Sequence, residues 1–364
     1  MTLDPFLSTK LRRLSVIGMI TVVYVHAFNF DDRYLWPGRP FEEAMNLPNF
    51  LQVLIANGLF RFGIPLFFLR SGFLIADTEE KYTPLTRVKK RLQTLVVPYL
   101  AWSLVGLLLT YLLEISPVTA PFVESSWLRP FNNTPLHQFT WLQWVEGWVV
   151  QPISFQLWFL RSLFVYSILY PLLVNGLERF PKSILIFLCL AWLLSFGFVI
   201  EGEGLFFFSL GILLRKKEVN LKDLTSLAMR IRLWWWLPAL LLLKTWISFQ
   251  PYIPVPLGYF LHKGIQVPLV LAVWVLYDKT IGLMASVIWL DRLNRYNFFL
   301  YGFHVPLLYY ATDWVLHLLG RNDYIRGGVY LLLPVIVMGI AFLLGWILRQ
   351  ISEPFFKVFT GGRN

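Results

Sequence analysis

Long apolar runs recur along the chain, and they constrain its fold more than any other feature. The first of them, Leu14 to Phe30, contains no Lys, Arg, Asp or Glu. A helix of about 20 apolar residues crosses the hydrocarbon core of a bilayer, and a helix satisfies its own backbone hydrogen bonds there. The sequence therefore predicts an all-α, polytopic membrane protein.

The charged clusters between these runs predict about ten transmembrane helices, which form one membrane domain over residues 1–364. The sixth run is too short to cross a bilayer alone, so we expect its helix to begin within residues 201–204. Pro65 predicts a kink in the second helix rather than its end. The expected spans lie near 14–30, 49–76, 92–113, 155–175, 183–200, 205–214, 233–249, 257–277, 296–318 and 328–348.

The distribution of Lys and Arg predicts the orientation of these spans. Only 15% of the residues are charged, against about 25% in soluble domains, and the net charge is +11. With a cytoplasmic N-terminus, 22 Lys and Arg lie in inner segments, 5 in outer segments and 5 within spans. Positive charge is retained in the cytoplasm during insertion, so we expect both termini there. The basic balance is explained mostly by topology, with anionic lipid headgroups or an anionic cytosolic ligand as second interpretations, and it indicates no nucleic acid partner.

Ionisable side chains inside the expected spans are costly and are functional candidates. His26 lies about 18 Å from the inner end of its span at ~1.5 Å per residue. Several others, with Glu201 and Glu203 at an outer turn, share this depth, which predicts a polar cavity open to the outside. The single cysteine, Cys189, excludes an intrachain disulfide and a paired-cysteine metal site. The ionisable residues within spans are His26, Arg61, Arg70, Arg161, Lys244, His262, Lys263, His304 and Asp313.

Structural alternatives stand beside each of these candidates. Lys244 and Lys263 have stems long enough to reach the interface, and Arg61 and Arg70 lie on the helix with the proline kink. His304 precedes a proline and fits a packing role as well as a functional one. Imidazole is too short to reach the interface from the depth of His26, so His26 is the strongest candidate.

Three tryptophans in the largest outer segment, 114–154, also allow two interpretations. Trp141, Trp144 and Trp148 follow helical spacing in "WLQWVEGWVV". Such a helix lies at the outer interface. The tryptophans then form either an aromatic belt or a platform on which a sugar stacks.

Seven segments together resemble the acyltransferase-3 family of integral membrane proteins. In order along residues 10–356 they are "LRRLSVIGMITVVYVHAF", "RFGIPLFFLRSGFLIA", "KKRLQTLVVPYLAW", "LWFLRSLFVYSILYPLL", "LFFFSLGILLRKK", "LNRYNFFLYGFHVPLLYY" and "ISEPFF". The resemblance implies a multi-pass protein of the bacterial cytoplasmic (inner) membrane. It also implies transfer of an acyl group, acetyl or succinyl, from cytoplasmic acyl-coenzyme A to a hydroxyl of an extracytoplasmic glycan or glycolipid.

The family's first-helix histidine corresponds to His26. The family usually has an arginine eleven positions earlier, where this chain has Ser15, with Arg12 and Arg13 nearby. Of the two arginines expected before the "PY" motif, Arg91 fills the first place and Thr94 stands in the second. These departures concern the contacts to the acyl donor.

Acyl transfer to an alcohol needs a base for the hydroxyl proton and donors for the oxyanion. We expect His26 to be the base, acting directly or after carrying the acyl group itself, and Arg161 to stabilise the oxyanion or position the glycan. We expect the cytoplasmic cluster Arg87, Lys89, Lys90 and Arg91 to bind coenzyme A phosphates, although a cytoplasmic loop that only sets the topology has the same composition. The cavity candidates are Arg13, Arg70, Glu201, Glu203, His262 and His304.

The expected partners are the lipid bilayer, acyl-coenzyme A as co-substrate and the glycan or glycolipid acceptor, with no metal or prosthetic group. The sequence predicts no oligomeric state. A transporter or flippase with His26 as a proton relay is the alternative. Transporters often contain internal repeats, and this sequence has none that we can recognise.

Overall fold

A computed structural model describes residues 4–32, 38–124, 128, 134–195, 201–221, 223–280 and 287–362. This part of the chain forms helices and contains no strand, so the predicted all-helical class is confirmed. The chain divides into two units. Unit 1 comprises Met1–Arg87 and Val165–Asn294, and unit 2 comprises Val88–Phe164 and Arg295–Asn364.

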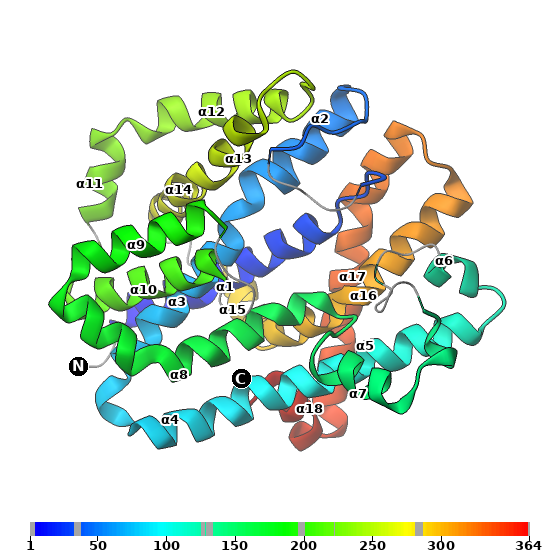
Figure 1. Ribbon diagram of the computed structural model, residues 1–364, viewed down its shortest axis with the longest axis horizontal. Coiled ribbons are helices and arrows are strands. Elements are labelled where there is room, and N and C mark those ends of the chain that lie inside the picture. Colours follow the sequence, from blue (N-terminus) through cyan, green and yellow to red (C-terminus); the bar gives the residue numbers. More distant parts are fainter. Residues whose placement is uncertain are drawn as a thin grey trace. The chain divides into compact units, whose positions relative to one another are not determined.

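Figure 1 shows the helices in the order of the sequence. Unit 1 contains α1 (Pro5–His26), α2 (Leu47–Val53), η1 (Leu54–Gly58), η2 (Leu59–Phe62), α3 (Gly63–Asp77), η3 (Glu79–Lys81), α9 (Pro181–Leu193), α10 (Gly202–Lys216), α11 (Asp223–Arg230), α12 (Leu233–Ile247), α13 (Val255–Gly264), α14 (Gln266–Lys279) and α15 (Ile288–Asn294). Unit 2 contains η4 (Leu92–Val96), α5 (Val97–Ile115), α6 (Ala120–Glu124), η5 (Leu136–Gln138), α7 (Trp141–Val149), η6 (Phe155–Leu157), α16 (Asn297–Leu319), α17 (Asp323–Ile351) and α18 (Glu353–Thr360). Two helices, α4 (Pro84–Arg91) and α8 (Trp158–Arg179), begin in one unit and end in the other.

Each expected span overlaps one or more of these helices, although residues 196–200 of the fifth span lie outside the described residues. The helix of the sixth expected span, α10, begins at Gly202, within residues 201–204 as predicted from its short apolar run. Within the described ranges, five helical stretches are long and apolar enough to cross a membrane: 47–77, 84–115, 155–179, 255–279 and 323–351. The pair α11 and α12, bent by 65°, is a sixth if it forms one span. The total of ten and the orientation stay predictions.

The second expected span is irregular in its middle and continues to Asp77, which agrees with the predicted kink. The backbone passes through a π turn at η1 and a 3-10 turn at η2 before α3 begins at Gly63. Pro65 lies in the first turn of α3. A proline ring displaces the carbonyl four residues before it, so the irregular segment lies where Pro65 requires it.

Two glycines allow α3 and α10 to pack closely at the centre of unit 1. A Cβ atom at Gly72 would lie 1.9 Å from the carbonyl oxygen of Phe208, and one at Gly211 would lie 2.0 Å from that of Leu69. Only glycine allows such an approach. Helix α1 packs against the other side of α3, so these three helices form the frame on which the polar side chains of unit 1 are mounted.

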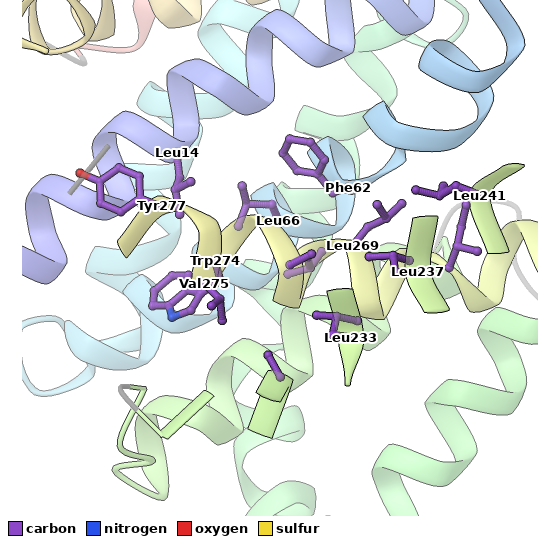
Figure 2. Close-up of a cluster of buried hydrophobic side chains, with 14 of the residues drawn as sticks. Leu14, Phe62, Leu66, Leu233, Leu237, Leu241, Leu269, Trp274, Val275 and Tyr277 are labelled. Atoms are coloured by element: carbon purple, nitrogen blue, oxygen red, sulfur yellow. The ribbon is translucent and has the colours of Figure 1, made fainter. Parts of the chain in front are cut away.

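The apolar core of unit 1 joins α1, α3, α12 and α14 (Figure 2). Leu66 from α3 meets Leu269 from α14, and Leu233, Leu237 and Leu241 follow one face of α12 at helical spacing. The buried members include Leu14, Phe62, Leu66, Leu233, Leu237, Leu241, Leu269, Trp274, Val275 and Tyr277.

Unit 2 is held together by aromatic packing of α5, α16 and α18. The Trp102 indole donates to the carbonyl of Phe359 at 2.9 Å and packs edge-on against Phe299, with ring centroids 5.0 Å apart. Gly302 leaves the space for this indole, since a Cβ atom there would lie 2.1 Å from it. Helix α17 in this unit leaves large apolar side chains exposed, including Leu332, Val335 and Ile336. An exposed apolar face of this length fits contact with lipid.

Candidate functional site

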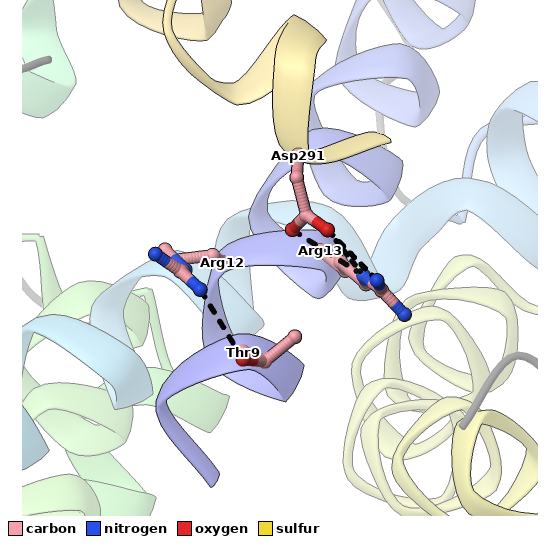
Figure 3. Close-up of polar contacts among 4 residues, drawn as sticks. All are labelled: Thr9, Arg12, Arg13 and Asp291. Atoms are coloured by element: carbon pink, nitrogen blue, oxygen red, sulfur yellow. Dashed lines mark hydrogen bonds and ion pairs between the residues drawn. The ribbon is translucent and has the colours of Figure 1, made fainter. Parts of the chain in front are cut away.

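Ion pairs gather at one end of unit 1, which we call the Lys10 end. The Lys10 ammonium lies 2.7 Å from the Asp278 carboxylate. Arg215 pairs with Asp77 at 2.8 Å, and Lys216 pairs with Glu79 and Glu178. Figure 3 shows Arg13 against the carboxylate of Asp291, with the shortest distance 2.7 Å. Each of these four cations, Lys10, Arg13, Arg215 and Lys216, meets a carboxylate.

These pairs also fix the directions of the helices. Lys10 and Arg13 lie near the start of α1, whereas Asp77, Arg215 and Asp278 lie at the ends of α3, α10 and α14. Helix α1 therefore runs antiparallel to the other three, as the predicted alternation of spans requires. The opposite end of unit 1, the His26 end, carries the last residue of α1 and the starts of α3, α10 and α14.

His26 is the last residue of α1 and is half-buried. Its position is held by the chain that follows. The backbone N–H of Asn29 donates to the side-chain oxygen of Gln52 at 2.8 Å. The Phe28 ring packs against Phe30 and Phe41. Helix α1 also contacts η1 and η2. A histidine held at the rim of a helix by packed neighbours is suited to act on a bound hydroxyl.

A carboxylate lies among cations at the same end. Glu203, in the first turn of α10, accepts a hydrogen bond from the Gln266 amide at 3.2 Å. Arg61 on η2 and Lys263 on α13 lie near enough to interact electrostatically with it. The backbone carbonyl of Glu201 accepts a hydrogen bond from the Tyr166 hydroxyl at 2.7 Å.

Two buried lysines at the His26 end bond to backbone carbonyls. The Lys244 ammonium donates to the carbonyl of Asn57 at 2.5 Å, and the Lys263 ammonium donates to the carbonyl of Trp192 and to the Ser195 hydroxyl. Their side chains are 2% and 6% exposed. In the described part of the chain neither lysine contacts a carboxylate. Both point into the protein, so the expectation that they reach the interface is wrong.

His262 completes this cluster, which we call the basic cluster: Arg61, Lys244, His262 and Lys263. The other three members surround the buried His262 ring electrostatically, and its Nδ1 makes no hydrogen bond to any described residue. A cavity of about 10 Å³ reaches the cluster, lined by Asn57, Lys244 and His262 with Arg39. Of the six cavity candidates only His262 lines this space, so the polar cavity open to the outside stays a prediction.

Arg70 contacts the residue that replaces the family's arginine. Its guanidinium donates to the Ser15 hydroxyl at 3.0 Å, and within the described ranges it contacts no carboxylate. Arg13, the other nearby candidate, is occupied by Asp291 in a two-pronged contact (Figure 3), and Arg12 bonds to Thr9. A guanidinium from α3 thus occupies the neighbourhood of position 15.

The four cations of α4 differ in their surroundings. Arg87 is buried, with its guanidinium 4.4 Å from the centre of the Tyr170 ring and donating to the carbonyl of Glu79 at 3.2 Å. Lys89 and Lys90 are exposed, and Arg91 is half-buried. Arg87 therefore fastens α4, while Lys89 and Lys90 lie at the surface.

The remaining candidates lie in unit 2. Arg161 donates to the carbonyl of Val150 at 3.3 Å. His304 is fully buried and bonds through Nδ1 to the carbonyl of Leu300 at 3.0 Å, next to the kink before Pro306. The Gln156 amide donates to the carbonyls of Gly302 and Val305 at 3.1 and 3.2 Å. Pro306 has no N–H, and its ring displaces the Gly302 carbonyl from the helical ladder. Gln156 restores that hydrogen bond, and a search confined to ionisable residues missed it.

The three tryptophans of α7 differ in their surroundings. The Trp148 indole donates to the carbonyl of Leu100 at 2.8 Å, and Trp144 packs edge-on against Tyr111. These two rings are packing residues. Trp141 is 72% exposed, so this ring is compatible with either an aromatic belt or a platform for a sugar.

Comparisons with known proteins identify one matching family and one curated relative. Residues 14–350 match the model of the family described as "Acyltransferase domain", Acyl_transf_3. The chain is similar to the succinoglycan biosynthesis protein ExoH of Rhizobium meliloti (strain 1021), with 26% identity over 233 residues. The match covers 62% of this chain and 59% of that relative. No solved structure matches the chain.

Proposed function

Because the chain belongs to the acyltransferase-3 family, we propose that it is an O-acyltransferase of the bacterial cytoplasmic membrane. It moves an acyl group, acetyl or succinyl, from cytoplasmic acyl-coenzyme A to a hydroxyl of an extracytoplasmic glycan or glycolipid. The position of His26 carries this proposal: it ends α1 at the opposite end of unit 1 from the Lys10 end. The printed role of the relative in succinoglycan biosynthesis supports a polysaccharide acceptor.

His26 acts as the base of the transfer. Its imidazole takes the proton from the acceptor hydroxyl as that oxygen attacks the thioester carbon, and a tetrahedral oxyanion forms. The carbon–sulfur bond then breaks, and the coenzyme A sulfur leaves with the proton held by the imidazolium. A covalent acyl-histidine is the alternative order of events. Arg161 stabilises the oxyanion or positions the glycan.

The donor contacts divide between two places. Arg70 presents a guanidinium with no carboxylate partner among the described residues, next to Ser15, and such a group favours a phosphate or a carboxylate. Lys89, Lys90 and Arg91 of α4 bind coenzyme A phosphates at the membrane surface. Arg87 holds α4 in place through Tyr170.

A transporter or flippase is the competing function, because a polar site between helices also suits passage of a glycan or lipid. Release of coenzyme A separates the two. Isolated membranes that contain the protein, given acetyl- or succinyl-coenzyme A and the host's own glycan, should release free thiol. Membranes with His26→Ala should release about 10²–10⁴-fold less. Equal release from both membranes, with normal insertion, contradicts an enzyme based on His26.

A further inference from the structure

The start of α12 exposes three tryptophans at the Lys10 end of unit 1. Trp235 is 84% exposed, and Trp234 and Trp236 are exposed as well. The ammonium of Lys279, the last residue of α14, lies 5.7 Å from the centre of the Trp234 ring, which places these rings at the Lys10 end. Tryptophan is enriched where a bilayer meets water, because its ring is apolar and its N–H is polar. The three rings therefore indicate where unit 1 meets the edge of the hydrocarbon.

Helix α11 turns away from the direction of α12 at this point. The two helices meet at 65°, and Arg232 between them has a left-handed backbone with φ of 52°. The Trp236 indole donates to the carbonyl of Ile231 at 2.8 Å, which holds the bend. Leu227 and Met229 of α11 are exposed. With α12 in the predicted seventh span, α11 inclines toward the plane of the membrane surface and carries these apolar side chains to it.

Three exposed cations accompany the tryptophans. They are Arg230, Arg232 and Lys279, and in the described part of the chain none of their side chains forms an ion pair or a hydrogen bond. The carboxylate of Asp278, next to Lys279, is paired with Lys10. The charge of these three side chains is thus available to a partner outside the protein.

Cations beside exposed tryptophans match the two parts of a phospholipid. An anion dissolved in water would contact the cations alone and leave the rings exposed. A phospholipid contacts both, since its phosphate meets the cations and its glycerol and upper acyl chains cover the rings. With the predicted orientation, the Lys10 end faces the cytoplasmic leaflet, where anionic headgroups attract Lys and Arg.

We propose that this surface, which we call the Trp235 surface, binds an anionic phospholipid of that leaflet. The cations contact the headgroup, and the rings lie against the glycerol and the first carbons of the acyl chains. The bound lipid holds α11 along the membrane surface. This inference goes beyond acyl transfer and does not depend on it. The surface consists of Arg230, Arg232, Trp234, Trp235, Trp236 and Lys279.

Competition between two lipids tests the inference. Native mass spectrometry counts the lipids that the detergent-purified full chain retains from an equal mixture of phosphatidylglycerol and phosphatidylcholine with the same acyl chains. Phosphatidylglycerol should be retained at least tenfold more, and an equal concentration of glycerol phosphate, which has no acyl chains, should not displace it. Equal retention of the two lipids overturns the proposal. Displacement by glycerol phosphate also overturns it, since the surface then binds a free phosphate.

Substitution of the cations identifies the surface. Arg230→Gln, Arg232→Gln and Lys279→Gln together should reduce the preference for phosphatidylglycerol by about fivefold for each charge removed. A matched control removes three other exposed cations of the Lys10 end, which contact no tryptophan among the described side chains, and should keep the preference. Its substitutions are Arg179→Gln, Lys182→Gln and Lys217→Gln.

Equal losses in the two triple variants contradict the site, because the total positive charge then explains the preference. Should the first triple variant fail to fold, Lys279→Gln against Lys182→Gln carries the same comparison. Trp235→Ala should reduce retention of both lipids by a similar factor, because the ring contacts the parts that the two lipids share. Unchanged retention of both lipids in Trp235→Ala would contradict the part assigned to the tryptophans.

Discussion

Cations at the two ends of unit 1 have different partners. At the Lys10 end, Lys10, Arg13, Arg215 and Lys216 each meet a carboxylate. At the His26 end, Lys244 and Lys263 bond to oxygens without charge. Ion pairs between helices stabilise the Lys10 end, whereas the two buried lysines of the His26 end are held by backbone carbonyls.

Removing one charge at each end of unit 1 should give the largest difference in stability between the two ends. Asp77→Asn leaves the partly buried Arg215 without its carboxylate and should cost about 3 kcal/mol of stability. Lys244→Met at the other end should leave stability unchanged or raise it. Thermal unfolding of the purified protein, in the same detergent, measures both. Asp77→Asn combined with Arg215→Met should recover much of the loss, and a large loss for Lys244→Met would show that its charge is structural.

Arg70 sharpens the comparison because it is a cation in the frame of unit 1 whose described side-chain partner is a hydroxyl. If it binds the donor, Arg70→Gln should raise the apparent constant for acyl-coenzyme A by about 10–100-fold, since a charged hydrogen bond contributes ~1.5–3 kcal/mol. Ser15→Arg added to that variant should restore much of the affinity. No change in the constant for Arg70→Gln would show that the guanidinium serves packing alone.

Substitutions of the exposed and the buried cations of α4 should have different effects. Lys89→Gln with Lys90→Gln should raise the apparent constant for acyl-coenzyme A about tenfold, because exposed charge contacts are weak. Arg87→Gln should instead lower the unfolding temperature, since it removes the contact with Tyr170, of about 1 kcal/mol. Equal effects of the two changes on the constant would place Arg87 among the donor contacts.

The pH dependence of stability tests the ion pair that defines the Lys10 end. Burial lowers the pKa of Lys10 to about 8, although the hydrogen bond to Asp278 opposes this. The unfolded chain, with a lysine pKa of 10.5, binds more protons than the folded one between these two values. Stability should therefore rise slightly as the pH increases from about 8 to 10. Lys10→Gln should reduce that rise, and an identical profile would contradict the shift.

Sequence patterns predicted the helices well because membrane helices are determined by local apolar length. The start of α10 at Gly202 followed from the shortness of its run, and the irregular turn before α3 followed from Pro65. The partner of each cation depends on contacts between residues far apart in the sequence. Lys244 donates to a backbone carbonyl of the irregular segment η1, and no local sequence pattern predicts that contact.

Only those members of the candidate site that a local pattern singles out could be proposed from the sequence. His26 could be selected from sequence because an imidazole is too short to reach the interface. Gln156 and Gln266 escaped notice since they carry no charge, although each contacts a group that the kinked or polar regions require. The replacement of an arginine at position 15 could be recognised from the resemblance, but the approach of Arg70 to Ser15 required the packing of α1 against α3.

Replacement of His26 by glutamine tests most directly whether the His26 end performs the reaction. Glutamine keeps hydrogen-bonding capacity and similar bulk but accepts no proton at neutral pH. The measurement is the acylation of surface glycans by mass spectrometry, with the exposed His317→Gln as the matched control. Acylation should fall by about 10²–10⁴-fold in the His26→Gln strain and stay normal in the control. Near-normal acylation with His26→Gln, at equal protein levels in the membrane, would contradict catalysis by His26.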